Sequence, residues 1–543
     1  MFTFPRFERL EASRSFRAVV FALSACVFAF ALHLCWLAFT APLEIEIREG
    51  SVWIEVLAKR AGIDIYDTIQ VAFVNMNHGP LDPILKAWIS RGAPMLPGHM
   101  VTRVFVLLTP VFFLASAYVI TGGQLAASML AAGSLVLVLA KMSVMVFVGR
   151  ADATAVCLVA VCGALAHQLL VSRHRNWSHR RYIATQVGLG AASAALFLTS
   201  WRFAPVIAAL QVAVLSTQLA GSNLDLRPTR LLPKLLLLLA RVGTALKHFV
   251  ISSALFVAGF AAIWLPVFLI ELHGDVRSYY RHFFGFFLGA SGWGIFPGGV
   301  FHIVPSELLD RRVASILLFA ALILWGLYRL RKAPGLLIAW LVMLSANWFA
   351  VAYGYFKNQG GGGLHYFVEF FALAWIFILH AFSRRRRWGA LAQLVLGCAV
   401  VLTLRPRDLL AQRELLAEAR KQGRVFRQYV ADMTHGEPVF SEETHLFKTK
   451  YRGELVDTGD TDAAVARTEY FGAAFTRTFE RYTRQLTSNP PKFVIGGLLE
   501  SDSPRILTAE LQQLLKTRYK LRVVARKTAF ATGGSQALFE RVD

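Results

Sequence analysis

Long apolar segments recur along most of the chain and restrict its fold to a bundle of membrane-spanning helices. Runs of about 20 apolar residues, enough for a helix to cross the hydrocarbon core, follow one another to about residue 404. Hydrophobic residues make up 56% of the chain and charged residues 17%, against about a quarter charged in soluble proteins. The sequence therefore predicts a mainly α, polytopic membrane protein.

Basic residues gather at the ends of these apolar segments, as in the run Arg384 to Arg387. The formal net charge is +23, but this distribution is typical of the positive-inside rule and excludes nucleic acid as the expected partner. It predicts about eleven spans in the inner (cytoplasmic) membrane, with the N-terminus cytoplasmic and the C-terminus periplasmic. The predicted spans are 18–40, 101–121, 124–148, 152–171, 183–200, 203–220, 248–270, 313–330, 334–353, 366–382 and 389–404.

The chain divides into two predicted domains. Residues 1–405 form the membrane domain, which includes a long outer loop at 41–100. Residues 406–543 contain no apolar span and alternate between helical and strand patterns, which predicts a soluble, periplasmic α/β domain. This domain shows no phosphate-loop or dinucleotide motif, so we expect it to assist acceptor or partner recognition rather than to carry chemistry.

An acidic stretch follows the first span directly. Glu44, Glu46 and Glu49 lie within a few residues of the predicted membrane surface. Acids near a bilayer are costly, so they usually have a partner or a task. Further along the same loop, Asp64, Tyr66 and His78 precede a Gly-Pro turn at Gly79 and Pro80. The spacing of Asp64, Asp67 and His78 is too loose to identify a metal site, so a divalent cation remains an open expectation and no cofactor is certain.

Three other segments fall on the predicted outer face. One is the short turn that carries Arg150 and Asp152, where the aspartate fits a helix cap, an ion pair or a sugar contact. A second is the loop 271–312, whose many aromatic residues fit an interfacial belt or a groove for an isoprenoid tail. The third is a Gly-rich loop after Lys357, a lysine that fits either a phosphate ligand or an end-of-helix cation.

The order of these motifs resembles the bacterial GT-C membrane glycosyltransferases, in particular the group that includes aminoarabinose transferases and protein O-mannosyltransferase-like enzymes. The motifs that carry the resemblance are Arg48-Glu49-Gly50, Gly62 with Tyr66, Gly79-Pro80-Leu81, Gly149-Arg150-Ala151-Asp152-Ala153, and Lys357-Asn358-Gln359-Gly360 with His365, Tyr366, Phe367 and Glu369. Two positions depart from the family pattern. Arg48 replaces an acid, which leaves open whether Glu49, Glu46 or Glu44 is the working acid, and His365 replaces an asparagine.

The resemblance implies transfer of a sugar from a polyprenyl-phosphate donor to an envelope glycan, lipid or protein on the outer face. A carboxylate would take the proton of the acceptor hydroxyl, and Glu49 is the first candidate, followed by Glu46 and Glu44. Cations would stabilise the leaving phosphate, and the candidates are Lys357, Arg202 and Arg281. The residues expected to bind the substrates are Asp64, Tyr66, His78, Arg150, Asp152, His365, Tyr366 and Glu369.

Two other classes of function compete with this interpretation. A transporter or flippase for a lipid-linked substrate would predict internal repeats and acids in the middle of the spans. The sequence shows no clear repeat, and its acids cluster in the outer loops. A non-catalytic scaffold for envelope assembly would need neither the acidic first loop nor the Lys-Gly loop on one face. Membrane lipids are expected partners under every interpretation.

Overall fold

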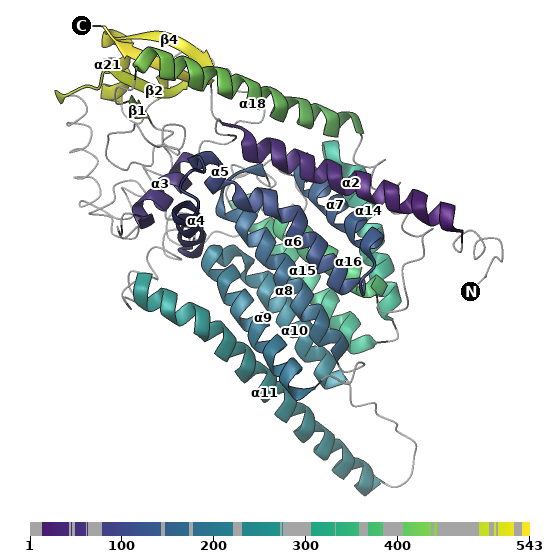
Figure 1. Ribbon diagram of the computed structural model, residues 1–543. Coiled ribbons are helices and arrows are strands. Elements are labelled where there is room, and N and C mark those ends of the chain that lie inside the picture. Colours follow the sequence, from purple (N-terminus) through teal and green to yellow (C-terminus); the bar gives the residue numbers. More distant parts are fainter. Residues whose placement is uncertain are drawn as a thin grey trace.

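The computed structural model is a helical bundle that carries a small sheet at one end (Figure 1). It describes residues 13–42, 45, 49–60, 62, 79–142, 147–172, 178–220, 231–271, 274, 306–331, 333–357, 367–383, 406–435, 439–441, 488–498, 504–505, 509–525 and 535–542.

Apolar helices form the bundle, as the hydropathy pattern predicts. Five described helices are long and apolar enough to cross a membrane, and five shorter apolar helices accompany them. The helices of the bundle are α2 (Arg14–Thr40), α6 (Val104–Ile120), α7 (Leu125–Met142), α8 (Ala151–Ser172), α9 (His179–Thr199), α10 (Ala204–Ala220), α11 (Leu231–Glu271), α14 (Ser306–Leu330), α15 (Pro334–Lys357) and α16 (Phe367–Ser383). The predicted span 389–404 lies outside the described residues, so the count of eleven stays a prediction. The protein is a multi-pass membrane protein.

The expected spans agree with the bundle at α9 and α10 and differ from it at α11. As predicted, α9 and α10 are separate helices, joined by the short 3-10 turn η2 (Trp201–Phe203). α11 begins at Leu231, well before the predicted start at 248, and crosses α9 closely. A Cβ atom at Gly190 would collide with the carbonyl oxygen of Phe256, and one at Gly259 with that of Val187, so the two glycines permit this backbone approach.

One continuous apolar core holds the bundle together. α2 packs on α6 and α7, α8 packs on α6 and α9, α10 packs on α15, and α16 packs on α8, α14 and α15. The core includes one buried polar contact between α8 and α16, in which the Nδ1 atoms of His167 and His380 lie 3.0 Å apart. This contact lies near the C-terminal ends of both helices, whereas the candidate site described below lies at their N-terminal ends.

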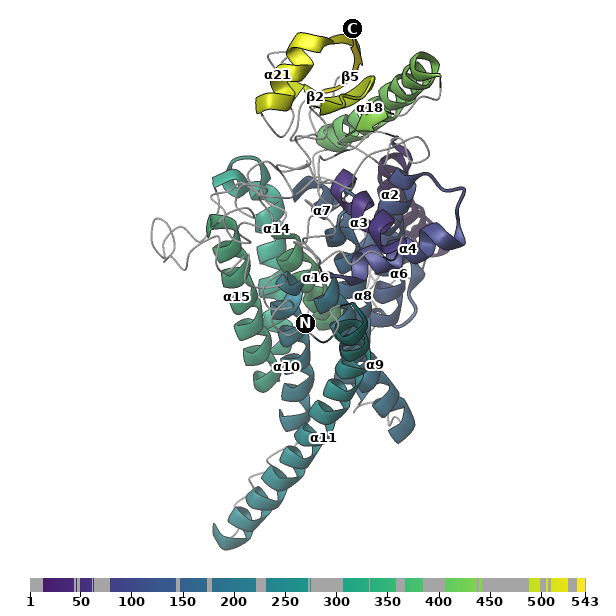
Figure 2. The ribbon, with the colours of Figure 1, turned by 90° about the vertical axis from the view of Figure 1, so that its left-hand side faces the viewer.

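Three short helices of the first outer loop cover one end of the bundle. They are α3 (Glu49–Arg60), α4 (Leu81–Gly92) and α5 (Gly98–Thr102). They share a small core of Trp53, Val56, Ala87 and Val101. Figures 1 and 2 show them at the end of the bundle that faces the C-terminal sheet. An ion pair between Lys59 and Glu271 ties α3 to the end of α11.

Helix α18 (Pro406–Thr434) connects the bundle to the sheet. Its first half contributes Leu409 and Leu416 to the core of the bundle, beside α2. Its second half places Phe426 and Val430 against the sheet. The predicted division at 405/406 therefore falls at the start of a helix that belongs to both parts, and the division itself stays a prediction.

The C-terminal sheet has strand order β1-β2-β5-β4, and β3 pairs with β2 beside this path. β1 (Val439–Ser441) and β2 (Phe493–Leu498) are parallel, and the other pairings are antiparallel. The remaining elements are β3 (Pro504–Arg505), α21 (Ala509–Arg518), β4 (Tyr519–Ala525) and β5 (Ser535–Arg541). The sequence pattern predicts strands at 438–441, 492–495, 519–525 and 537–541, and these correspond to β1, β2, β4 and β5. The predicted fold class, a mainly helical membrane domain with a small α/β part, is confirmed.

Candidate functional site

The structure describes the surroundings of five predicted site residues: Glu49, Arg150, Asp152, Arg202 and Glu369. All five lie at the end of the bundle covered by α3–α5, where α2 ends and where α6, α8, α10 and α16 begin. For Lys357 the structure describes only the backbone, which ends α15. The predicted residues outside the described part are Glu44, Glu46, Asp64, Tyr66, His78, Arg281, His365 and Tyr366.

Glu49 begins α3 and is wholly buried against Arg103, which precedes α6. The guanidinium holds both carboxylate oxygens, with Nε donating to Oε1 at 2.6 Å and Nη2 donating to Oε2 at 2.5 Å. Two backbone N–H groups also donate to it: Gly149 to Oε1 at 2.6 Å and Ile45 to Oε2 at 2.7 Å. Each oxygen of Glu49 therefore accepts two hydrogen bonds.

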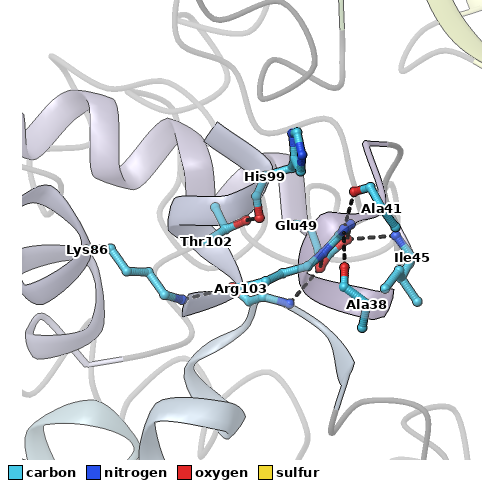
Figure 3. A network of polar contacts seen from close by, with 9 residues as sticks. Ala38, Ala41, Ile45, Glu49, Lys86, His99, Thr102 and Arg103 are labelled. Atoms are coloured by element: carbon cyan, nitrogen blue, oxygen red, sulfur yellow. Dashed lines mark hydrogen bonds and ion pairs between the residues drawn. The ribbon is translucent and has the colours of Figure 1, made fainter. Parts of the chain in front are cut away.

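Arg103 also closes the end of α2 (Figure 3). Its Nη1 donates to the carbonyl oxygens of Ala38 and Ala41, at 2.9 and 2.5 Å. Ala38 lies in the last turn of α2, and its carbonyl also accepts the N–H of Ala41, the residue that caps the helix. A fixed guanidinium fork suits such simultaneous contacts to a carboxylate and to carbonyls. Arg103 therefore joins α2, the start of α3 and the start of α6.

A second buried ion pair reaches the same turn from α4. Lys86 donates from Nζ to Asp82 Oδ2 at 2.7 Å and to the carbonyl oxygen of Gly149 at 2.8 Å. Thr154 donates to the other oxygen of Asp82. Lys86 and Asp82 are one helical turn apart, and both are buried. Gly149 is thus held at its N–H by α3 and at its carbonyl by α4.

The third group of charges follows Gly149 directly. Arg150 Nε lies 3.4 Å from Asp152 Oδ2, and Asp152 Oδ1 lies 3.5 Å from Arg202 Nη1. Arg202 also donates twice to Glu369 Oε1, from Nε at 2.9 Å and from Nη2 at 2.7 Å. All four side chains are largely buried, and Arg202 is the most exposed of them at 15%. The structure thus brings four predicted site residues into one cluster.

Glu49 and Glu369, two of the three predicted acids that the structure describes, differ in what their oxygens contact. Both oxygens of Glu49 are occupied, so a proton on either would displace a donor. Among the described residues, Glu369 makes hydrogen bonds only through Oε1, and only with Arg202. The role of Glu49 as a base stays a prediction, and its surroundings favour a different role, that of holding the loop.

Three charged residues of the site were not predicted: Arg103, Lys86 and Asp82. A signal for Arg103 was available, because a cation at the outer end of a span runs against the positive-inside rule. Arg150 and Arg202 share that location. Lys86 and Asp82 gave no comparable signal, since charges on a short amphipathic helix are normally solvated.

The described residues identify no metal centre. Among them, no group of three or more His, Cys, Asp or Glu side chains is placed to hold a metal ion. The predicted cluster of Asp64, Asp67 and His78 lies outside the described part, so the expectation of a divalent cation is neither confirmed nor wrong.

No protein-family model matches the chain, and no curated protein sequence resembles it. Its structure does resemble solved structures. The match to the crystal structure of ArnT from Cupriavidus metallidurans bound to undecaprenyl phosphate covers 98% of this chain and 99% of that one, with a TM-score of 0.54 and 14% identity. The apo structure of the same protein matches over 95% of this chain and 97% of that one, with a TM-score of 0.52 and 12% identity. This chain therefore shares the fold of ArnT along nearly its whole length, which fits the fold that the resemblance implies.

Proposed function

We propose that the protein transfers a sugar from a polyprenyl-phosphate donor to a cell-envelope acceptor at the outer face of the membrane. The observation that carries this proposal is the cluster of buried charges at one end of the bundle. Charges in a membrane domain are costly and usually mark a substrate site. A protein of the same fold has been solved with undecaprenyl phosphate bound, which supports a polyprenyl phosphate as the ligand class.

In this reaction the acceptor oxygen forms a bond to C1 of the sugar, and the bond between C1 and the phosphate oxygen breaks. The acceptor loses its proton to a base, and the lipid phosphate leaves with added negative charge. Arg202 is the described candidate for contact with that phosphate, because its guanidinium is the most exposed of the cluster. Lys357 and Arg281 are the further candidates that the sequence predicts.

We assign the proton-accepting role to Glu46 or Glu44. Both belong to the acidic stretch that follows the first span. In the third acid of that stretch, Glu49, each carboxylate oxygen already accepts from Arg103 and from a backbone N–H group. A base must have an oxygen within hydrogen-bond reach of the proton it removes. Asp152 and Glu369 then orient Arg202, while Asp64, Tyr66, His78, His365 and Tyr366 remain the proposed contacts to sugar and acceptor.

The test uses purified protein in lipid nanodiscs with synthetic polyprenyl-phosphate sugars and a crude envelope extract as acceptor. Mass spectrometry should show loss of the sugar from the lipid, release of polyprenyl phosphate and a matching mass gain on one acceptor. Movement of intact donor across the bilayer of proteoliposomes would instead identify a transporter or flippase. A protein that binds the extract but changes neither donor nor acceptor would be a scaffold.

A further inference from the structure

The backbone of Gly149 connects the first outer loop to the charged cluster, because its N–H donates to Glu49 and its carbonyl accepts from Lys86. We propose that Lys86 is a positioning residue, which acts through the carbonyl of Gly149 on Arg150 and Asp152 and thereby sets the affinity for the donor phosphate. This inference rests on the proposed function and adds to it a residue with no predicted role.

The first step concerns the cost of placing Lys86 where it is. Its side chain is wholly buried, and its ammonium has two acceptors, Asp82 Oδ2 and the carbonyl oxygen of Gly149. A buried ion pair is weak support for stability, because a well-packed apolar pair of similar volume often serves as well. The burial of Lys86 and Asp82 is better explained by the second hydrogen bond of Lys86, which reaches the carbonyl of Gly149 in the 149–152 turn.

The second step concerns Gly149 itself. A Cβ atom there would lie 2.9 Å from both the carbonyl carbon and the Cβ of Thr102, so the turn lies directly against the end of α5. Its N–H donates to Glu49 and its carbonyl accepts from Lys86. Both hydrogen-bonding groups of this residue are therefore fixed by side chains of the outer loop, one from α3 and one from α4.

The third step leads from the turn to the phosphate. Arg150 follows Gly149 in the chain and pairs with Asp152. Asp152 in turn shares Arg202 with Glu369. A shift of the turn changes where Asp152 meets Arg202, and so changes how the guanidinium is aimed. The loop helices α3 and α4 thus control the cation that is proposed to meet the leaving phosphate.

The test separates the contact to Gly149 from the burial of a lone charge. Lys86→Met alone leaves Asp82 charged and buried, so it is compared with the double variant Lys86→Met with Asp82→Asn. The asparagine can still accept from Thr154, and the double variant carries no uncompensated charge. Arg91→Met on the exposed side of α4 is the matched control, since among the described residues Arg91 donates hydrogen bonds to the backbone carbonyls of Lys59 and Arg60 and none to the 149–152 turn.

The readouts are the affinity of the full-length protein for undecaprenyl phosphate and its midpoint of thermal unfolding, both in detergent. We expect the double variant to unfold within a few degrees of the wild type yet to bind undecaprenyl phosphate about tenfold more weakly, as the loss of a hydrogen bond from a charged donor predicts. Arg91→Met should match the wild type in both readouts. Wild-type affinity in the double variant would overturn the inference.

A cycle with Asp152→Asn tests whether Lys86 acts through the turn. If it does, adding Lys86→Met and Asp82→Asn to the Asp152→Asn protein should change its affinity for undecaprenyl phosphate less than threefold, because the effects of coupled residues are not additive. A further tenfold loss in that background would show an independent effect and overturn the inference. If the wild type itself does not bind undecaprenyl phosphate, the proposed function fails and this inference fails with it, whereas wild-type binding with unaltered variants refutes the inference alone.

Discussion

Replacing Glu49 with glutamine distinguishes a carboxylate that holds the outer loop from one that takes a proton. The amide keeps the size of the side chain but presents an N–H₂ group where the carboxylate accepted from Arg103 and a backbone N–H. The guanidinium then remains buried without its counter-charge. Removing one partner of a buried ion pair costs about 3–5 kcal/mol. This cost should fall on the attachment of α3 to the bundle rather than on the bundle as a whole.

Hydrogen exchange measured by mass spectrometry reports that attachment directly. A factor of ten in an opening equilibrium corresponds to about 1.4 kcal/mol, so the amides of α3 should exchange roughly a hundredfold to a few thousandfold faster in Glu49→Gln. The amides of α8 should change little. Adding Arg103→Met to Glu49→Gln removes the unpaired buried charge. The amides of α3 in this double variant should then exchange more slowly than the two single variants predict when their free-energy effects are added.

The same change at Glu46 is the matched control. If Glu46 is the base, Glu46→Gln should slow transfer by about two to four orders of magnitude. The amide hydrogens of α3 should exchange no faster in this variant than in the wild type. If Glu44 is the base, Glu44→Gln shows that behaviour instead. A Glu49→Gln protein that retains wild-type exchange in α3 and loses transfer by the same factor would refute the holding role and restore Glu49 as the base.

Three further predictions concern the donor site, the topology and the C-terminal part. Lys357→Met should weaken binding of undecaprenyl phosphate and slow transfer in a folded protein, and Lys357→Arg should restore only part of both, because a planar fork differs from a point charge. A cysteine introduced at Ser441 should react with an impermeant label from the outer side of intact cells, and labelling that requires permeabilised cells would contradict the odd number of spans. Truncation after Arg405 should lower the thermal midpoint more than truncation after His435, because α18 contributes two leucines to the core of the bundle.

Hydropathy alone was enough to predict most of the fold. Each described helix of the bundle overlaps a predicted span, because the part of a helix that faces lipid must be apolar. The start of α11 was missed, since its first turns extend the apolar pattern through basic residues that were assigned to a loop. The role of α18 was also missed. The sequence predicts a charged helix near 407–430 that leaves the membrane, and nothing local in it indicates that two of its leucines reach the bundle.

The candidate site was predicted less completely than the fold, for a physical reason. Motif order identified Glu49, Arg150, Asp152 and Glu369, because acids and cations stand out beside apolar spans. Their pairing could not be predicted, since Glu49 contacts Arg103 and Gly149 across long stretches of chain. Lys86 was missed for the same reason: its partner on the helix is local, but the contact that gives it a role is the carbonyl of Gly149.

The charges of the described site cancel, and this constrains where the donor phosphate is compensated. Glu49 faces Arg103, Asp82 faces Lys86, and Asp152 and Glu369 face two arginines. A donor in which phosphate links sugar and lipid carries one negative charge, and the released lipid phosphate carries about 1.5 to 2 near neutral pH if it ionises like other phosphate monoesters.

A cluster whose formal charge is zero can stabilise the added negative charge on the leaving phosphate only through oriented dipoles and hydrogen bonds. Any net positive charge at the phosphate must come from other residues or from a bound cation. The groups that could supply it are Lys357, Arg281 or a divalent cation bound by the outer loop. The described residues then fix geometry, and we expect the charge that favours departure of the phosphate to come from one of these three sources.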